Sequence, residues 1–209
     1  MTHSRILRWR MFGVALAVSV VVACSEAPAP TQARSSAKQQ ASAVFAGGCF
    51  WCTEADFDKI PGVISTTSGY SGGTLANPTY KQASAGGTGH IESVRVVYDP
   101  TKVSYETLGR KFVHTIDPLD DGGSFCDRGH TYRSAYFVAN PAQDKIARAT
   151  LNQAAAQLGQ PVKTLVLAAA PFYTAEEYHQ NYYQKNPIRY AFYRSRCGRD
   201  ARLKQLWKK

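Results

Sequence analysis

Apolar and polar side chains alternate at several places in the chain, which predicts short β-strands. In residues 92–98, Val94, Val96 and Tyr98 share one face, the spacing expected of a half-buried strand. Shorter apolar runs predict further strands at 44–46, 63–67, 132–138 and 162–169. The last of these runs is continuously apolar, so we expect that strand to be buried on both faces.

Helices are predicted where capping residues precede a periodic apolar pattern. Asn140 and Pro141 supply an N-cap and a first-turn proline for one helix. Thr174 and Glu177 have the spacing of a capping box, which predicts a helix that runs to about residue 185. Two more helices are expected over 49–60 and 105–116.

The order of these elements indicates the fold class. Strands and helices alternate, several connecting loops are long and rich in glycine, and no internal repeat is present. This pattern predicts an α+β fold, a two-layer sandwich in which helices cover a mixed central sheet with a ferredoxin-like core.

Residues 1–23 have the three-part pattern of an export signal. Arginines precede a mostly apolar stretch, residues 11–23, which is shorter than the ~20 residues of a membrane-spanning helix. A short aliphatic run that ends in Ala23 and is followed by Cys24 is similar to a bacterial lipobox. We therefore expect Cys24 to carry a lipid that anchors the protein at the periplasmic side of the cell envelope. Ser25, the residue after the lipidated cysteine, favours the outer membrane as the final location. The alternative to a lipoprotein signal is an ordinary secretory peptide or a signal anchor.

Composition and charge divide the remaining chain. Residues 24–42 are rich in Ala, Pro, Ser and Gln, which predicts a flexible tether. Residues 43–189 hold 13 basic and 13 acidic side chains, and this neutrality argues against a nucleic-acid binder, whose folded face is basic. We expect the catalytic domain to cover 43–190. Residues 191–209 then form a basic tail that is either solvated or in contact with anionic lipid.

The segment GGCFWC, residues 47–52, carries the candidate chemistry. Its two glycines permit unusual backbone angles, and a cysteine at a helix N-terminus meets free N–H groups that favour the thiolate. Phe50 and Trp51 are too apolar for an exposed loop unless they line a pocket. Cys49 is therefore the candidate nucleophile on the floor of an aromatic pocket. The alternative is that Cys49 is half of a structural disulfide.

A series of further segments accompanies GGCFW at 47–51. They are PGV at 61–63, GYSGG at 69–73, NPTY at 77–80, GHIESVRVVYDP at 89–100, HTIDP at 114–118, DRGHTYRSA at 127–135, PFYTAEEYHQNY at 171–182 and KNP at 185–187. A lone C-x-x-C motif is weak evidence, whereas this ordered series closely resembles the peptide methionine sulfoxide reductase A family. The resemblance implies thiol-dependent reduction of the S epimer of methionine sulfoxide, free or in proteins, without a bound cofactor.

The resemblance also implies the roles of the reacting groups. Cys49 would attack the sulfoxide sulfur, and Glu92 would give a proton to the departing oxygen. Burial in an aromatic pocket would raise the pKa of Glu92 and keep it protonated near neutral pH. Without the resemblance, Glu92 has the pattern of a solvated carboxylate at a strand end.

The other pocket residues implied by the resemblance recognise the substrate. Tyr80 and Tyr132 would donate hydrogen bonds to the sulfoxide oxygen, and Asp127 would organise the pocket. Phe50 and Trp51 would hold the methyl group. Taken one at a time, each of these residues is typical of ordinary packing or of a turn.

After oxygen transfer Cys49 would be a sulfenic acid, which a second thiol converts to a disulfide. Cys197 lies in the region that supplies this thiol in many relatives and is slightly favoured. Cys52 stands where many relatives have glycine and could resolve directly, whereas Cys126 is a relay or a structural partner of Cys197. A thioredoxin-like donor would restore the thiols. Cys126 and His130 have a metal-like spacing but no further ligands, so we predict no metal.

Two other functions remain open at this point. A thiol–disulfide oxidoreductase would use Cys49 and Cys52 alone, and it would not require Glu92, Tyr80 or Tyr132. A membrane-tethered binding lipoprotein would use its cysteines only in structural disulfides. The expected partners of the reductase are oxidised proteins, peptides or free methionine sulfoxide, and we expect a monomer.

Overall fold

The computed structural model describes residues 39–208, so the predicted signal, Cys24 and most of the tether lie outside the described residues. The strands are β1 (Ala41–Gly47), β2 (Val63–Ser71), β3 (Ile91–Tyr98), β4 (Gly123–Ser124), β5 (Asp127–Arg128), β6 (Ser134–Val138), β7 (Leu165–Ala168) and β8 (Phe172–Thr174). The helices are α1 (Phe50–Phe57), α2 (Tyr80–Ser84), α3 (Tyr105–Val113), α4 (Pro141–Leu158), α5 (Tyr182–Lys185), α6 (Pro187–Arg196) and α7 (Arg199–Leu206). Short 3-10 turns cover His130–Tyr132 and Glu177–His179. Within this described part, no helix is both long and apolar enough to cross a membrane.

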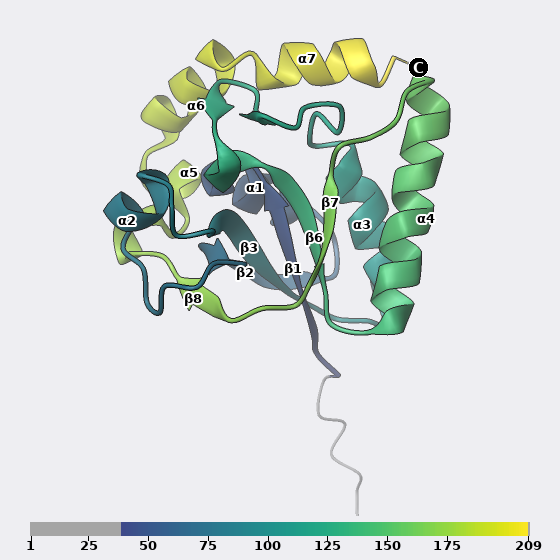
Figure 1. The fold of residues 1–209 in the computed structure, drawn as a ribbon, viewed down its shortest axis with the longest axis horizontal. Helices are drawn as coiled ribbons and strands as arrows, with labels where there is room; N and C mark the ends of the chain where they lie inside the picture. Colours follow the sequence, from purple (N-terminus) through teal and green to yellow (C-terminus); the bar gives the residue numbers. More distant parts are fainter. Residues whose placement is uncertain (1–38, 209) are drawn as a thin grey trace, which may run out of the picture. The chain divides into compact units, whose positions relative to one another are not determined.

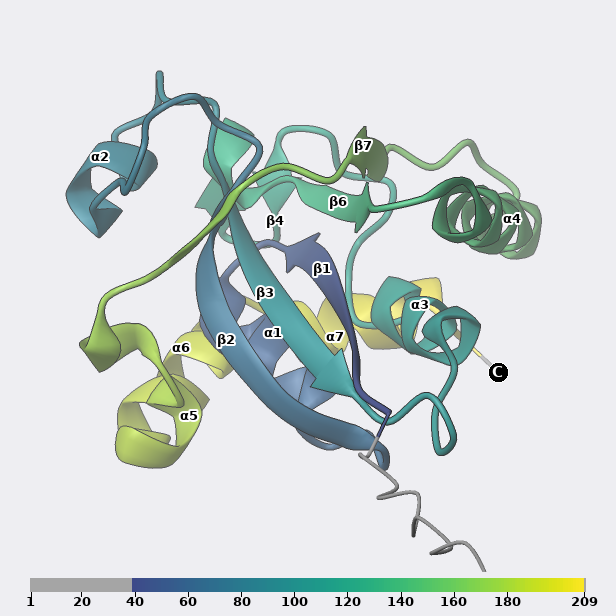
Figure 2. The same cartoon turned by 90° about the horizontal axis from the view of Figure 1, so that it is seen from below.

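Six strands form one curled sheet in the order β7-β6-β1-β3-β2-β8 (Figure 1). The β6–β7 pair is parallel and the other neighbours are antiparallel, so the sheet is mixed. Helices α1, α3 and α4 contact the strands, and β2 and β3 curve strongly along their length (Figure 2). The predicted α+β fold with a mixed sheet is confirmed.

The main core lies between the sheet and these helices. Phe45 of β1 is fully buried, and its ring centroid lies 4.9 Å from that of Phe57 and 5.1 Å from that of Phe112. Val94 and Val96 of β3 belong to the same buried cluster, as the predicted alternation requires. Burial of these apolar side chains supplies most of the driving force that holds the helices on the sheet.

The opposite sheet face has a smaller core. Ala46, Ile91, Ala135 and Phe137 form a second buried cluster. A Cβ atom on Gly72, in the loop after β2, would lie 3.2 Å from the Phe137 ring, so this loop approaches the sheet closely. The loops rather than a helix layer therefore cover this face.

The predicted capping of α4 is confirmed. The Asn140 Oδ1 accepts a hydrogen bond from the Gln143 N–H at 3.0 Å, and Pro141 occupies the first turn. Gly159 ends the helix with a left-handed φ of 66°. Such a glycine C-cap is common because glycine adopts this conformation without a steric penalty.

Two local predictions are wrong. The predicted buried strand at 162–169 is β7, an edge strand of four residues whose side chains are half-buried or exposed. The predicted capping box does not form, because Thr174 belongs to β8 and the Glu177 carboxylate pairs with Lys185 at 2.7 Å. Asn181, with φ 52°, interrupts the expected helix.

The chain beyond residue 190 is folded, not the tail expected from its charge. Arg194 of α6 binds both carboxylate oxygens of Asp56 at 3.0 and 3.1 Å, and Arg202 of α7 binds Asp117 at 2.7 Å. These pairs attach α6 and α7 to the rest of the domain. The boundary expected at residue 190 is therefore absent, and the folded domain runs through the described C-terminal residues.

Candidate active site

Gly47 and Gly48 place Cys49 at the start of α1. A Cβ atom on Gly47 would lie 2.6 Å from the Thr53 Oγ1. Gly48 has φ +80°, and a Cβ atom there would lie 2.4 Å from Ser124. Glycine is required at both positions because any other side chain would collide. The strand therefore turns sharply into the helix, with Cys49 as its N-cap residue, as the sequence predicts.

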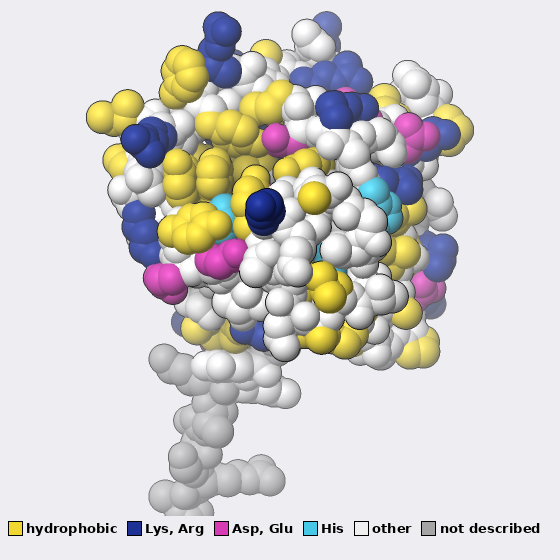
Figure 3. All heavy atoms as spheres, turned by 60° about the vertical axis from the view of Figure 1, so that its left-hand side comes forward, with side chains coloured by type: hydrophobic (Ala, Val, Ile, Leu, Met, Phe, Trp, Pro, Cys, Tyr) yellow, Lys and Arg dark blue, Asp and Glu magenta, His cyan; other side chains and the backbone are white. Residues whose placement is uncertain are grey.

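A cavity of about 250 Å³ opens beside Cys49. Its lining comes from five parts of the chain: Cys49, Phe50, Trp51, Tyr80, Glu92, Asp127, Tyr132 and Tyr193. On the side of the molecule that carries α2, α5 and α6, hydrophobic side chains gather around a hollow (Figure 3). The structure thus brings together the predicted nucleophile, acid, hydroxyls and aromatic walls. The most distant of these predicted residues, Cys49 and Tyr132, are 83 residues apart in sequence.

Glu92 is the buried carboxyl group of this cavity. It lies on the helix-facing side of β3 with 2% of its surface exposed, and its Oε2 accepts the Phe50 N–H at 3.0 Å. Burial raises the pKa of Glu92 to about 8, and the nearby Asp127 and Cys52 add to the rise, against the opposing hydrogen bond from Phe50. The carboxyl group is therefore protonated near neutral pH and can act as a proton donor.

Tyr80 and Tyr132 are neutral hydrogen-bond donors in the same cavity. Tyr80 begins α2, where its N–H donates to the Glu176 Oε1 at 2.8 Å. Both hydroxyls line the cavity, and burial raises the pKa of both tyrosines, as does the nearby Glu92. They can therefore both bind one acceptor atom placed between them.

The aromatic wall is held rigidly. The Trp51 ring stacks on Tyr182 with centroids 3.7 Å apart and planes 7° from parallel. Its Nε1–H donates to the His179 Nδ1 at 3.0 Å. Phe50 is 1% exposed, and its ring lies 4.9 Å from that of His179. An apolar group of fixed size can therefore be held against this wall.

The two free thiols occupy different electrostatic environments. Burial raises the pKa of Cys49, and the neighbouring Cys52 and Glu92 raise it further. The hydrogen bond with Cys49 lowers the pKa of Cys52, which the guanidinium groups of Arg199 and Arg194 lower further. Burial therefore opposes the thiolate of Cys49 that its position at the helix N-terminus favours.

Cys126 and Cys197 form a disulfide across 71 residues of sequence. Cys126 precedes Asp127 of the cavity wall, and Cys197 caps α6. The disulfide therefore fastens the C-terminal helices to the site. Cys49 and Cys52 are the free cysteines of the described residues. His130 does not join Cys126, since its Nε2 interacts with the Gly89 carbonyl at 3.2 Å.

Sequence reasoning missed the residues that the C-terminal helices contribute. The Tyr193 hydroxyl lies in the cavity and donates to the Asp127 Oδ2. Arg199 is 2% exposed and donates to the Gly47 carbonyl at 3.3 Å and to the Thr115 carbonyl at 2.8 Å. The sequence did contain a signal for an aromatic helix face, because Tyr190 and Tyr193 are three residues apart and such residues lie on the same face of a helix. The basic composition concealed it.

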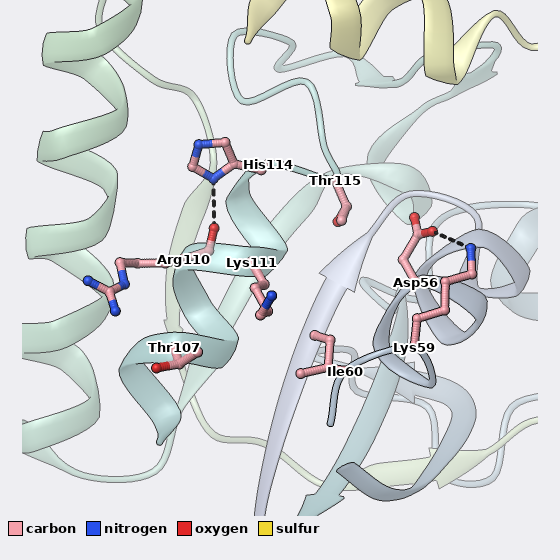
Figure 4. Close-up of a pocket in the computed structure, with 8 residues that line it drawn as sticks. All are labelled: Asp56, Lys59, Ile60, Thr107, Arg110, Lys111, His114 and Thr115. Atoms are coloured by element: carbon pink, nitrogen blue, oxygen red, sulfur yellow. Dashed lines mark hydrogen bonds and ion pairs between the residues drawn. The ribbon is translucent and has the colours of Figure 1, made fainter. Parts of the chain in front are cut away.

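A larger cleft of about 530 Å³ lies between α1 and α3 (Figure 4). Lys59 and Asp56 form an ion pair in it at 3.5 Å, and the His114 Nδ1 interacts with the Arg110 carbonyl at 2.7 Å. No cysteine lines this cleft. Because oxygen transfer to sulfur needs a nucleophilic thiol, the smaller cavity beside Cys49 is the candidate active site.

The cavity combines a buried thiol with a carboxyl group that is protonated near neutral pH, two hydroxyls and a rigid aromatic wall. This combination, on an α+β fold, is that of a thiol-dependent oxidoreductase. A family model described as peptide methionine sulfoxide reductase matches residues 41–209. The chain belongs to the peptide methionine sulfoxide reductase A family.

Individual relatives agree with this assignment. The chain is 48% identical over 198 residues to peptide methionine sulfoxide reductase MsrA 2 of Caulobacter vibrioides, covering 94% of this chain and 96% of the relative. It is 50% identical over 165 residues to the enzyme of the same name from Rhizobium meliloti, covering 79% and 82%.

Solved structures are similar as well. Methionine sulfoxide reductase A of Corynebacterium diphtheriae matches with a TM-score of 0.64 and 35% identity, over 71% of this chain and 76% of that one. Mxr1 from Saccharomyces cerevisiae in reduced form matches with a TM-score of 0.68 and 28% identity, over 72% and 87%.

The buried Glu92 gives the protein a pH-dependent stability. The folded protein keeps this proton up to about pH 8, whereas the unfolded chain loses it near pH 4.5. The free energy of unfolding therefore falls as the pH rises between these values. We expect Glu92→Gln to lose less stability than the wild type between pH 5 and pH 9, measured by urea denaturation. Glu106→Gln, an exposed carboxyl group of α3, is the control. Equal pH slopes for the wild type and Glu92→Gln would contradict the assignment.

Proposed function

We propose that this chain reduces the S epimer of methionine sulfoxide, free or in proteins, to methionine. The observation that carries the proposal is that one cavity with an apolar wall holds both Cys49 and Glu92, whose pKa burial raises to about 8. A sulfoxide presents an oxygen, a methyl group and a side-chain stem to three different surroundings. The hydroxyls of Tyr80 and Tyr132 fit the oxygen, and Phe50 with Trp51 fits the methyl group. Because the sulfoxide sulfur is a stereocentre, holding its oxygen and methyl group in separate parts of the cavity selects one epimer.

In net terms the chemistry transfers one oxygen atom and two electrons. The Cys49 sulfur attacks the sulfoxide sulfur and forms an S–S bond, while Glu92 gives its proton to the oxygen, whose negative charge grows as the S–O bond breaks and which leaves as water after taking a second proton. A water molecule then attacks the Cys49 sulfur and breaks the S–S bond. Methionine leaves with its sulfur reduced by two electrons. Cys49 is oxidised by two electrons and becomes a sulfenic acid.

We further propose that Cys52 resolves this sulfenic acid. The Cys52 sulfur attacks the Cys49 sulfur, a disulfide forms, and the hydroxyl leaves as water. Three findings support Cys52: it is free, its interaction with the Cys49 side chain lowers its pKa, and Arg199 and Arg194 favour its thiolate. Cys197, slightly favoured from the sequence, is bonded to Cys126 instead. A thioredoxin-like dithiol protein then reduces the Cys49–Cys52 disulfide.

Replacement of the acid separates this function from simple thiol–disulfide exchange. In Glu92→Gln we expect reduction of methionine sulfoxide to fall by about 10²- to 10⁴-fold, because the proton donor is lost. Exchange of the Cys49–Cys52 pair with a model disulfide should persist, since exchange needs no acid at this position. Glu177→Gln, an exposed glutamate, should retain full reductase activity. Equal loss of both activities in Glu92→Gln, or loss of neither, would overturn the proposal.

Mass mapping after a single turnover tests the resolving thiol. With one equivalent of methionine sulfoxide, we expect the wild type to gain a Cys49–Cys52 disulfide while Cys126–Cys197 stays intact. Cys52→Ser should instead accumulate a Cys49 sulfenic acid that dimedone traps. The paired substitution of Cys126 and Cys197 by Ser should still form the Cys49–Cys52 bond. A Cys49–Cys197 bond in the wild type would show that the basic C-terminal segment rearranges and resolves.

We also propose that the protein is a lipoprotein of the periplasmic side of the cell envelope, in the outer membrane. Its support is the sequence of residues 1–25, and the site chemistry does not depend on it. In cells given labelled palmitate, we expect the full chain to take up label and to partition into detergent. Cys24→Ala should do neither, because the acceptor sulfur is gone. Cys52→Ser controls for loss of a cysteine. Unchanged labelling of Cys24→Ala would refute the anchor.

A further inference from the structure

Tyr193 lies between the nucleophile and a carboxylate. Its hydroxyl lines the cavity with Cys49 and donates to the Asp127 Oδ2, and its interaction with the Cys49 side chain lowers the pKa of that thiol. The edge of the Trp51 ring faces it, with centroids 5.6 Å apart and planes at 78°. One hydroxyl group therefore connects the sulfur of Cys49 to a carboxylate on a different element.

Both ends of this connection are fixed. Asp127 directly follows Cys126, and the Cys197 N–H donates to the Tyr193 carbonyl at 3.0 Å, so the Cys126–Cys197 disulfide ties together the segments that carry the pair. Arg194, next to Tyr193, holds α6 on α1 through Asp56.

The reaction requires a proton acceptor for Cys49. The thiolate is the nucleophile, and the resting thiol is protonated because burial raises its pKa. Glu92 cannot accept this proton, because it already carries one and must give it to the oxygen. The titratable and charged groups around Cys49 and Asp127 come from α1, α2, β3, α6 and α7. They are Cys52, Tyr80, Glu92, Tyr193 and Arg199, and the 3-10 turn at His130–Tyr132 adds Tyr132.

Asp127 has the properties of the missing acceptor. Burial raises the pKa of its carboxyl group above the ordinary value, which makes it a stronger base than a solvated aspartate, while Tyr193 and Arg199 hold back the rise. Its contact with Cys49 passes through the Tyr193 hydroxyl. Tyr193 itself keeps its proton at neutral pH, because burial and the neighbouring Cys49 raise its pKa.

We propose that Tyr193 relays the proton of the Cys49 thiol to Asp127, so that this carboxylate activates the nucleophile. The inference rests on the proposed function. The S–H proton of Cys49 moves to the Tyr193 oxygen as the Tyr193 proton moves to the Asp127 Oδ2. The products are a thiolate, a neutral tyrosine and a neutral carboxylic acid, with no electron transferred. Tyr193 is then a catalytic residue that the C-terminal helices add to the site.

A relay has a distinctive pH signature. Internal transfer from Cys49 to Asp127 leaves the net charge of the protein unchanged. Over the pH range that lies above the pKa of Asp127 and below the pKa of Cys49, the fraction of reactive thiolate therefore does not depend on pH. Alkylation of Cys49 should therefore reach a plateau between about pH 5.5 and 7.5. A thiol that loses its proton to solvent would instead react about tenfold faster per pH unit.

The test uses iodoacetamide as the probe and peptide mass mapping to follow Cys49 alone. It is run on the full chain in a Cys52→Ser background, with the Cys126–Cys197 disulfide intact. We expect the plateau in this background and its loss in both Tyr193→Phe and Asp127→Asn, with Cys49 reacting at least about tenfold more slowly at pH 6. Combining the two substitutions should add nothing, because both break the same path. Tyr183→Phe, which also removes a tyrosine–aspartate hydrogen bond but outside the cavity, should keep the plateau.

Several results would overturn the relay. They are a tenfold rise per pH unit in the background protein, a plateau that survives in Tyr193→Phe, or faster alkylation in Asp127→Asn at pH 6. The last would mean that Asp127 acts only through its charge, since removing a nearby anion lowers the pKa of a thiol. Alkylation needs no sulfoxide, so its outcome is separate from the proposed function. With Cys52 present, Tyr193→Phe should lower kcat for methionine sulfoxide by about tenfold or more, whereas a purely structural role would raise KM.

Discussion

The site depends on one hydrogen bond between segments that are far apart in sequence, from the Phe50 N–H at the start of α1 to the carboxyl group of Glu92 on β3. Removing that carboxyl group from water costs free energy and leaves it protonated, and the same burial makes it an acid beside the nucleophile. The packing of α1 on the sheet therefore controls the chemistry. A small shift of the helix would admit water, and the carboxyl group would then ionise.

The same burial creates a second requirement. A cavity dry enough to keep Glu92 protonated also disfavours the thiolate of Cys49, so proton donor and nucleophile have opposite needs. The C-terminal helices answer this conflict at two places. Arg194 and Arg199 favour the thiolate of Cys52, and Tyr193 connects Cys49 to Asp127. Arg194 of α6 and Arg199 of α7 thus have a chemical role, because their positive charge lowers the pKa of the Cys52 thiol.

The Cys126–Cys197 disulfide and the ion pairs of Arg194 make this arrangement durable. A disulfide that closes a long loop stabilises a fold chiefly by restricting the unfolded chain. Here it also joins the residue before Asp127 to the end of the helix that carries Tyr193. A link that stabilises the fold is therefore also a link that positions groups of the cavity.

The sequence by itself determined the fold class, the central strands, the capped helix at Asn140 and the nucleophile turn, because these depend on local periodicity, capping and glycine sterics. With the family resemblance it also named every residue that lines the cavity except Tyr193. Only the tertiary structure decided that β7 is an edge strand, that Cys197 pairs with Cys126 and that Tyr193 reaches the cavity. Burial, disulfide pairing and pKa depend on which distant residues come together, and that is absent from any local pattern.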